Sequence, residues 1–424
     1  MSESKKIQAV KGVRDILPPE SALWSRVEQT AREVFAAYNF REIRLPEFEQ
    51  TELFARSVGL DTDIVGKEMY TFADRDDASI SLRPEATASV VRAYIEHGMH
   101  TLPGDVKLYY IGPMFRRERP QKGRYRQFYQ IGAEVLGRSE RPAIDAELIE
   151  MLLIFIGRCG LNEHTLHINS IGCLKCRSAY IEVLRTALAA VKDQLGPDSQ
   201  RRIQSNPLRV LDSKLPGEQA VIEALPRLSA HLCQDCAAHF TQLRMELKMR
   251  RIAYQENWRL VRGLDYYTRT TFEVTAPGLG SQDAICGGGR YDGLVELLGG
   301  PPTKGIGFAL GTDRFLLALK EAGAGAVPAG IDVFVAWFSF VTYPMAARLA
   351  RRLRDAGLSV EMVHEDLKFK KSLGLADRMG ARFVVLIGET EMAAGTCTVK
   401  RLADGTQQTV AETEIVDYLK SAGS

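Results

Sequence analysis

A long antiparallel hairpin is the feature that most limits what this chain can fold into. Two strand-like runs lie between Val106 and Val135, and they flank a polar turn that begins at Arg116. Apolar and aromatic residues dominate both runs, whereas the turn contains Gly, Pro and charged residues, as hairpin loops do. The pattern predicts a long antiparallel hairpin whose loop carries the charge.

The turn is rich in arginine. From Arg116 to Arg126 the sequence has five arginines and one lysine against one glutamate. The whole chain is almost neutral, with 55 Lys and Arg against 53 Asp and Glu, so a polyanion would have to meet a local cluster such as this one. Arginine binds phosphate in a bidentate, fixed geometry, which favours polyphosphate or an RNA backbone as the partner. A solvated hairpin tip is the alternative.

The second strand of the hairpin has one face typical of a pocket wall. Because side chains alternate along a strand, Phe128, Gln130, Gly132 and Glu134 share that face. We expect Gly132 to leave an open space between the two polar groups, and Phe128 indicates that the face is partly covered. A solvent-facing strand is the alternative.

Two polar segments lie where helices are expected to begin. Glu85 follows an apolar run and precedes a helical one, so a helix cap is its simplest interpretation and a ligand contact the alternative. Thr312 and Asp313 also suit a helix start, but the charge of Arg314 opposes the helix dipole there. A bound phosphate would resolve that conflict, and so would a surface pair with Asp313 or Glu321.

Glycines and tyrosines form two further clusters. Tyr266 and Tyr267 are adjacent, and Gly287–Gly289 are three consecutive glycines that we place at a strand end, where a ligand could approach the backbone closely. Neither a Gly-x-Gly-x-x-Gly fingerprint nor a P-loop is present in the sequence. Rossmann-type and P-loop nucleotide binding are therefore disfavoured.

The seven cysteines are an odd number, which indicates thiols or ligands rather than a disulfide framework. Cys173 and Cys176 form one Cys-x2-Cys pair and Cys233 and Cys236 another, with a long stretch between the pairs. The spacing inside each pair suits structural zinc, but the long separation weakens that interpretation and favours ordinary thiols as the alternative. We propose no catalytic metal from the sequence.

Composition shifts divide the chain into domains of mixed α/β and α+β class. A helical, polar segment interrupts the first domain, and a stretch without long side chains precedes a small three-layer α/β unit in which acidic and basic residues balance. No apolar run approaches the roughly 18 residues of a membrane span, and the start lacks a signal sequence, so we expect a cytoplasmic protein with no membrane partner. The expected boundaries are 1–172 and 258–321 for the discontinuous first domain, 173–257 for the helical insertion, 322–330 for the linker and 331–424 for the last domain.

Together these motifs resemble those of class II aminoacyl-tRNA synthetases, and specifically the histidyl-tRNA synthetase family. Phe115–Glu134 is similar to class II motif 2, Gly305–Arg314 to motif 3, and the segment around Pro46 to motif 1. Leu260–Tyr267 and Gly287–Gly293 resemble the two signatures of the histidine enzymes. The resemblance implies a class II antiparallel sheet flanked by helices, a helical insertion, a C-terminal anticodon-binding α/β domain and a homodimer.

The resemblance also implies an activity. L-Histidine would be ligated to tRNA(His) in two steps, through a histidyl-adenylate formed from ATP with Mg2+ and then transfer to the terminal ribose of the tRNA. Arg116 would hold the α-phosphate and Arg314 the γ-phosphate, and Arg262 would add a third cation near the histidine carboxylate. An ionised carboxylate that attacks phosphorus needs no general base, so positioning and charge stabilisation would suffice.

The resemblance further assigns the amino-acid site. A neutral imidazole offers one hydrogen-bond donor and one acceptor, which Glu134 and Tyr267 would meet, with Tyr266 beside them. Glu85, Thr87 and Gln130 would surround the α-amino group. Ala86 stands where relatives often have glycine, which narrows the site slightly. Arg119 and Gln121 would approach the acceptor end of the tRNA.

Two alternatives belong to other functional classes. One is the synthetase-like regulatory subunit of ATP phosphoribosyltransferase, which binds histidine without charging tRNA and usually lacks the last domain. The other is a synthetase for proline, threonine or glycine. The arginines and the segment beyond the linker disfavour the first, and the two histidine-type signatures disfavour the second.

Overall fold

The computed structural model describes residues 7–59, 62, 64–261, 264, 266–280, 283–326, 330–365 and 367–423. The chain divides into two compact units, Met1–Ala326 and Val327–Ser424, and the division lies within the stretch 322–330. Among the described residues, no helix is both long enough and apolar enough to cross a bilayer.

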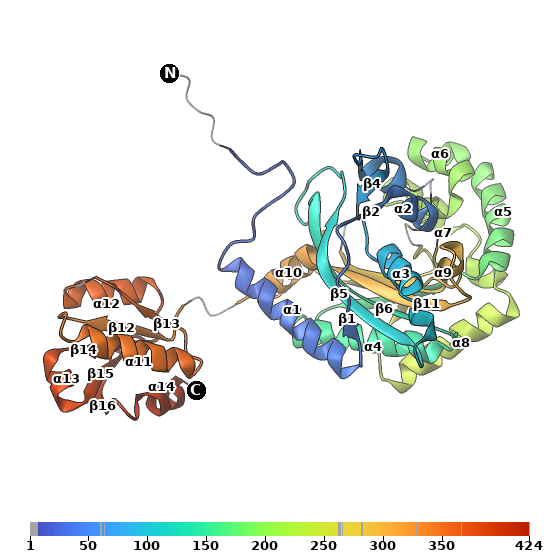
Figure 1. Cartoon of the computed structure of the whole chain (residues 1–424). Coiled ribbons are helices and arrows are strands. Elements are labelled where there is room, and N and C mark those ends of the chain that lie inside the picture. Colours follow the sequence, from blue (N-terminus) through green and yellow to red (C-terminus); the bar gives the residue numbers. More distant parts are fainter. Residues whose placement is uncertain are drawn as a thin grey trace, which may run out of the picture. The chain divides into compact units, whose positions relative to one another are not determined.

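An eight-stranded sheet is the centre of the first unit (Figure 1). Its inner strands are antiparallel, and only the two-residue edge strands β1 and β8 pair in parallel with their neighbours. The predicted hairpin is confirmed, since Val106 pairs with Leu136 and Phe115 with Gln127. In spatial order the strands are β1 (Arg41–Glu42), β5 (Val106–Phe115), β6 (Gln127–Gly137), β11 (Lys304–Gly311), β10 (Ala284–Arg290), β9 (Thr268–Thr275), β7 (Thr165–Ser170) and β8 (Gln255–Glu256).

Three helices cover one face of this sheet, α1 (Glu20–Ala37), α4 (Pro142–Arg158) and α8 (Gln234–Met249) (Figure 1). Apolar residues recur on one side of α1 at helical spacing and are buried there. Phe35 packs edge-on against Phe155 of α4 at a ring distance of 5.6 Å. Helix α10 (Thr312–Glu321) lies on the same side, because its Phe315 packs against Phe155 at a ring distance of 5.7 Å. The opposite face is thereby left for polar side chains and for other helices of the unit.

A small three-stranded sheet lies beside the main sheet and was not predicted. It consists of β2 (Phe48–Gln50), β4 (Ser79–Leu82) and β3 (Tyr70–Ala73), with β4 in the middle. It leads into α3 (Thr87–Glu96) and packs with α2 (Thr51–Val58) and a π-helical turn, Ile64–Glu68. The short strands explain why alternation in the sequence did not reveal them.

The segment between β7 and β9 is mainly helical, as expected. It contains α5 (Leu174–Ala190), α6 (Pro197–Ser205), α7 (Gln219–Glu223) and α8, joined by short 3-10 turns, of which two lie between α6 and α7. Tyr180, Leu184 and Leu188 recur every four residues on α5 and are fully buried. They belong to the same hydrophobic core as Tyr266 and Tyr291 of the main domain. The segment therefore packs continuously with the first unit.

The second unit is a five-stranded sheet with helices, as predicted, but with one additional strand. In spatial order its strands are β13 (Val360–Met362), β12 (Val333–Trp337), β14 (Phe383–Ile387), β15 (Thr396–Arg401) and β16 (Gln407–Ala411). Separate hydrophobic cores cover its two faces, which explains why every residue of β12 and β14 is buried. The helices are α11 (Tyr343–Asp355), α12 (Phe369–Arg378), α13 (Glu389–Ala394) and α14 (Ile415–Gly423).

Candidate active site

A cavity of about 540 Å³ opens on the polar side of the main sheet. Strands β5, β6, β9, β10 and β11 and the first residues of α3 and α10 (Thr312–Glu321) supply its walls. Its volume lies within the usual range for small-molecule sites. The residues predicted from the sequence that line it are Glu85, Thr87, Arg116, Gln130, Glu134, Tyr266, Tyr267 and Arg314.

One end of the cavity is built around the carboxyl group of Glu134. Its Oε1 accepts a hydrogen bond from the Thr87 hydroxyl at 2.7 Å, and its Oε2 accepts one from the Tyr291 hydroxyl at 2.7 Å. Burial raises the pKa of Glu134 to about 8, since the two hydroxyl donors only partly offset the loss of water and the charge of Glu85 adds to it. The carboxyl group is therefore mostly protonated at neutral pH in the empty cavity.

Glu85 lies at the start of α3 and caps it. Its carboxylate accepts hydrogen bonds from the backbone N–H groups of Thr87 at 2.7 Å and Ala88 at 3.0 Å. Burial raises the pKa of Glu85, while these backbone donors and the charge of Arg116 oppose that shift. The Glu85 side chain therefore both caps α3 and forms part of the cavity wall. Ala86 is fully buried in the core below and is not part of the cavity wall.

Tyrosines close this end of the cavity. Tyr266 packs against Tyr267 at a ring distance of 4.7 Å and edge-on against Tyr291 at 5.8 Å. Among the described residues, the buried Tyr110 hydroxyl and Gln130 Oε1 have no hydrogen-bond partner, and both residues line the cavity. Buried polar atoms are rarely left unpaired, so these two atoms mark positions where a polar ligand would be stabilised.

The sequence predicts an open space for a ligand at Gly132, and this prediction is wrong. A Cβ at this position would lie 2.3 Å from the Tyr110 hydroxyl oxygen and 2.7 Å from the carbonyl oxygen of Phe308. The absent side chain therefore makes room for the Tyr110 ring rather than for a ligand. Gln130 and Glu134 on either side of it do line the cavity, as predicted.

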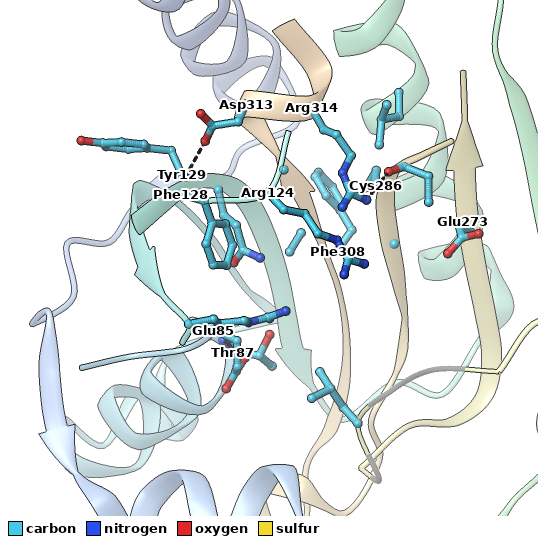
Figure 2. Close-up of a pocket in the computed structure, with 18 of the residues that line it drawn as sticks. Glu85, Thr87, Arg124, Phe128, Tyr129, Glu273, Cys286, Phe308, Asp313 and Arg314 are labelled. Atoms are coloured by element: carbon cyan, nitrogen blue, oxygen red, sulfur yellow. Dashed lines mark hydrogen bonds between the residues drawn. The ribbon is translucent and has the colours of Figure 1, made fainter. Parts of the chain in front are cut away.

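Three arginines gather at the other end. The Arg116 Nε donates to the carbonyl of Pro84 at 2.9 Å, and its guanidinium lies over the Phe128 ring at 5.2 Å. Arg124 donates to Glu118 at 3.2 Å, and Arg314 donates to the carbonyl of Ala284 at 3.1 Å. Figure 2 shows Arg124 and Arg314 directed into the same space, with Glu85 and Thr87 at the opposite end.

The three arginines at this end are partly buried, and their like charges lie near one another. Burial lowers the pKa of the Arg314 guanidinium, and the neighbouring charge of Arg124 lowers it further. Asp313 and Glu321, the alternative partners of Arg314, each contact another cation: Asp313 accepts a hydrogen bond from Arg14 at 3.0 Å, and Glu321 lies 3.6 Å from Lys122. A cationic site at a helix start favours an anion with several charges, such as a polyphosphate.

Asp313 connects the elements that carry the arginines. One of its oxygens accepts the backbone N–H of Tyr129 at 3.1 Å, a bond drawn in Figure 2, and the other accepts from Arg14. This carboxylate fixes the start of α10 against strand β6 and against the N-terminal segment. The Arg314 and Arg116 side chains consequently enter one cavity from elements far apart in the sequence.

Other predicted positions lie outside the cavity wall. Arg119 and Gln121 are exposed in the hairpin loop, which two backbone hydrogen bonds between Gln121 and Arg124 close at 3.1 and 2.9 Å. Arg262 lies outside the described residues.

The glycines Gly287–Gly289 are within strand β10 rather than at its end, and a Cβ at Gly288 would lie 2.4 Å from the carbonyl oxygen of Gly307. At Gly288 the close neighbour is therefore another strand, whereas Gly287 does line the cavity.

Several cavity residues have no role predicted from the sequence, among them Tyr291, Tyr110 and Arg124. Tyr291 follows the glycine run, but its partner Glu134 is 157 positions away, so only the register of β6, β11 and β10 brings them together. Arg124 is one of several arginines in the hairpin loop, and their charge alone does not tell which of them faces the cavity.

Comparisons with known proteins identify the family of the chain. The histidyl-tRNA synthetase family profile matches residues 12–315, and an anticodon binding domain profile matches residues 332–422. The chain is 53% identical to a histidine–tRNA ligase of Koribacter versatilis, over 99% of this chain and 97% of that protein. It is 50% identical to one of Solibacter usitatus, over 99% of this chain and 100% of that protein.

Solved structures agree as well. The crystal structure of apo histidyl-tRNA synthetase from S. aureus has a TM-score of 0.81 at 38% identity, and the match covers 98% of this chain and 100% of that one. A Bacillus halodurans structure described as an ATP phosphoribosyltransferase regulatory subunit/histidyl-tRNA synthetase has a TM-score of 0.67 at 20% identity, over 91% of this chain and 99% of that one, and shows the fold alone. The fold is that of a class II aminoacyl-tRNA synthetase. Within that class, the chain belongs to the histidyl-tRNA synthetase family.

Proposed function

We propose that this enzyme ligates L-histidine to tRNA(His), first forming a histidyl-adenylate from ATP and then transferring the histidyl group to the terminal ribose. The observation that carries the proposal is one cavity with a buried carboxyl–hydroxyl end and a three-arginine end. The first end suits a small polar amino acid, and the second suits a polyphosphate. The high identity to histidine–tRNA ligases over nearly the whole chain supports the same activity.

In the first step, the histidine carboxylate attacks the α-phosphorus and pyrophosphate leaves. The nucleophile is already ionised, so the protein has to align the reactants and stabilise added negative charge. Arg116 is proposed at the α-phosphate, Arg314 at the γ-phosphate, and Arg262 between the α-phosphate and the histidine carboxylate. Mg2+ bound to the phosphates would share the charge, and the Glu273 carboxylate in the cavity wall is of the right type to hold it.

Selectivity for histidine is proposed to come from the carboxyl–hydroxyl end. Glu134 accepts the imidazole N–H, while Tyr267 meets the other ring nitrogen and Tyr266 packs beside it. The hydroxyl groups of Thr87 and Tyr291 hold the Glu134 carboxyl group in one orientation, so an amino acid without a ring donor would leave a buried carboxyl group unpaired. Glu85, Thr87 and Gln130 surround the α-amino group.

The tRNA is proposed to contact both units. Arg119 and Gln121 are exposed on the hairpin loop at the rim of the cavity-bearing unit, which suits contact with an acceptor end. The match of residues 332–422 to an anticodon binding domain supports recognition of the anticodon by the second unit. That unit carries no net charge, so stacking and hydrogen bonding would dominate there.

A homodimer in the cytoplasm completes the proposal. The register of the small sheet places Phe48, Phe72, Ile80 and Leu82 on one face. Phe48 is 57% and Phe72 47% exposed, although both are large apolar residues. A second copy of the chain would cover this face, which follows the segment around Pro46 that resembles motif 1. Sedimentation analysis of the Phe72→Ser variant, which should shift towards monomer, tests this part.

Histidine-dependent ATP–pyrophosphate exchange, with the other amino acids as controls and followed by charging of tRNA, tests the main proposal. Exchange with histidine alone and subsequent charging are expected. Histidine binding without exchange would favour the regulatory paralogue instead, and exchange with proline, threonine or glycine would favour another class II synthetase.

A further inference from the structure

Four cysteine sulfurs lie together at the junction between the helical segment and the main sheet. Cys173, Cys176, Cys233 and Cys236 each offer a sulfur, and all four sulfurs lie within 4.8 Å of one another. We propose that these four cysteines bind a structural Zn2+ ion. This site is separate from the cavity and from the ligation chemistry.

The distances fit a metal centre rather than disulfides. Cys173 Sγ lies 3.6 Å from Cys176 Sγ and 3.9 Å from Cys233 Sγ, and Cys176 Sγ lies 3.8 Å from Cys236 Sγ. A tetrahedron with zinc–sulfur bonds of about 2.3 Å has edges of about 3.8 Å. A disulfide would need a sulfur separation of about 2.05 Å. Three of the six sulfur separations therefore match the edges of such a tetrahedron, and the other three are at most 4.8 Å, so one zinc ion would fit among the four sulfurs.

The two cysteine pairs occupy equivalent places in the fold. Cys173 is the N-cap of α5 and Cys233 the N-cap of α8, and the second cysteine of each pair lies in the first turn of its helix. The positive ends of both helix dipoles thus face the sulfurs and favour thiolates, the form that binds zinc. The backbone N–H of Cys173 also lies 3.2 Å from Cys176 Sγ and 3.2 Å from Cys236 Sγ. Such N–H···S contacts stabilise the charge of a four-thiolate centre.

The backbone before the first pair is shaped around the cluster. Gly172 has a φ of +67°, and a Cβ there would lie 2.5 Å from Cys176 Sγ. Only glycine satisfies both conditions without displacing a sulfur. The neighbouring residue Arg269 of β9 donates its N–H to the carbonyl of Gly172 at 2.8 Å, so the cluster is attached to the main sheet.

The cysteine cluster is also connected to the carboxyl–hydroxyl end of the cavity through a hydrogen bond. Arg177, one residue beyond Cys176 on α5, donates to the backbone carbonyl of Tyr267 at 2.5 Å. Because four protein sulfurs complete a tetrahedral shell, the zinc would have no open position for catalysis. Its role is to hold α5 and α8 together, and thereby to hold Arg177 on the segment that carries Tyr267.

Metal analysis of the full-length protein, purified under reducing conditions without chelator, tests the proposal. We expect one equivalent of zinc per chain, loss of that zinc in Cys236→Ser, and retention in the matched control Cys159→Ser. Cys159 is a buried thiol of the same unit outside the cluster. Equal zinc content in both variants, or a wild-type protein that neither contains zinc nor takes it up, would overturn the proposal.

A second measurement uses the wild-type protein and covers the case in which Cys236→Ser does not fold. Titration with a mercurial reagent should release the zinc in step with modification of four thiols, as followed with a zinc-sensitive dye. Co2+ exchanged into the site should give the intense absorption of tetrahedral thiolate coordination. Octahedral Co2+ spectra, or zinc release unrelated to thiol modification, would contradict a four-cysteine site. Neither readout depends on aminoacylation, so this proposal can fail while the proposed function holds.

Discussion

The two ends of the cavity satisfy their polar groups in different ways. At the carboxyl–hydroxyl end, Glu134 has donors on both oxygens from within the protein, and burial keeps its carboxyl group mostly protonated. At the arginine end, Arg116, Arg124 and Arg314 place like charges around one space, and burial lowers the pKa of Arg314. The first end is thus preorganised before ligand arrives, whereas the second gathers positive charge that suits a polyanion.

Removal of a charge from the arginine end should have the largest effect. Arg116→Ala should lower kcat for histidine-dependent pyrophosphate exchange by about 10²–10³ or more, because added charge at the α-phosphate would lose a preorganised donor. Arg117→Ala is the matched control, since Arg117 is the exposed neighbour of Arg116 and does not line the cavity. Similar losses in both variants would mean that loop integrity, and not the Arg116 guanidinium, is responsible.

Glu134→Gln should raise the KM for histidine by about 10–100-fold, in line with loss of a buried hydrogen bond to a charged acceptor. The KM for ATP should change little, because the side chain keeps its shape and lies at the other end of the cavity. Steady-state exchange kinetics with each substrate varied separately provide the measurement. If both KM values rose equally, the substitution would have disturbed packing instead of recognition.

A smaller loss is expected when the support of Glu134 is altered. Tyr291→Phe removes the hydroxyl that binds Oε2 and retains the ring, which packs against Gly305 and Tyr266. We expect the KM for histidine to rise by about 5–10-fold, which corresponds to one hydrogen bond of roughly 1 kcal/mol. Unchanged histidine affinity together with an unchanged melting temperature would show that Thr87 alone orients the carboxyl group.

The smallest expected effect is on the number of protons released when histidine binds. Because the pKa of Glu134 is about 8 in the empty cavity, histidine that binds to its ionised form displaces a proton at pH 7. Proton release should therefore be greater for the wild type than for Glu134→Gln, with the difference vanishing above pH 9 as Glu134 ionises before binding. Calorimetry of histidine binding in buffers of different ionisation enthalpy measures the number of protons released. Equal release by both proteins at pH 7 would mean that the carboxyl group is already ionised.

Local patterns in the sequence were sufficient for features that lie within one element. Alternation placed Gln130 and Glu134 on one strand face. The arginine-rich turn pointed to Arg116, and the unfavourable helix dipole to Arg314, as anion-binding candidates, and all four residues line the cavity. Tyr291 was not found because its contact with Glu134 depends on strand register across the sheet. For the same reason Gly132 was misjudged, since the Tyr110 ring that fills its space comes from the neighbouring strand.

In the fold, too, the elements that could be predicted are those marked by residues close together in the sequence. Strands with a buried apolar run, such as β12 and β14, were predicted from their composition. Strand β16 is short, polar and mostly exposed, so nothing in its alternation distinguished it from a loop. The cysteine pairs left two possibilities open in the sequence, because only the meeting of two helix starts brings the four sulfurs together.

The Arg14–Asp313 contact has a consequence for how the chain is made. These residues are 299 positions apart, and Asp313 also receives the N–H of Tyr129. During synthesis on the ribosome, Arg14 emerges first and its partner among the last residues of the first unit. The arginine end of the cavity therefore acquires its final shape only when synthesis of that unit is almost complete. Truncated nascent chains consequently lack a finished arginine end.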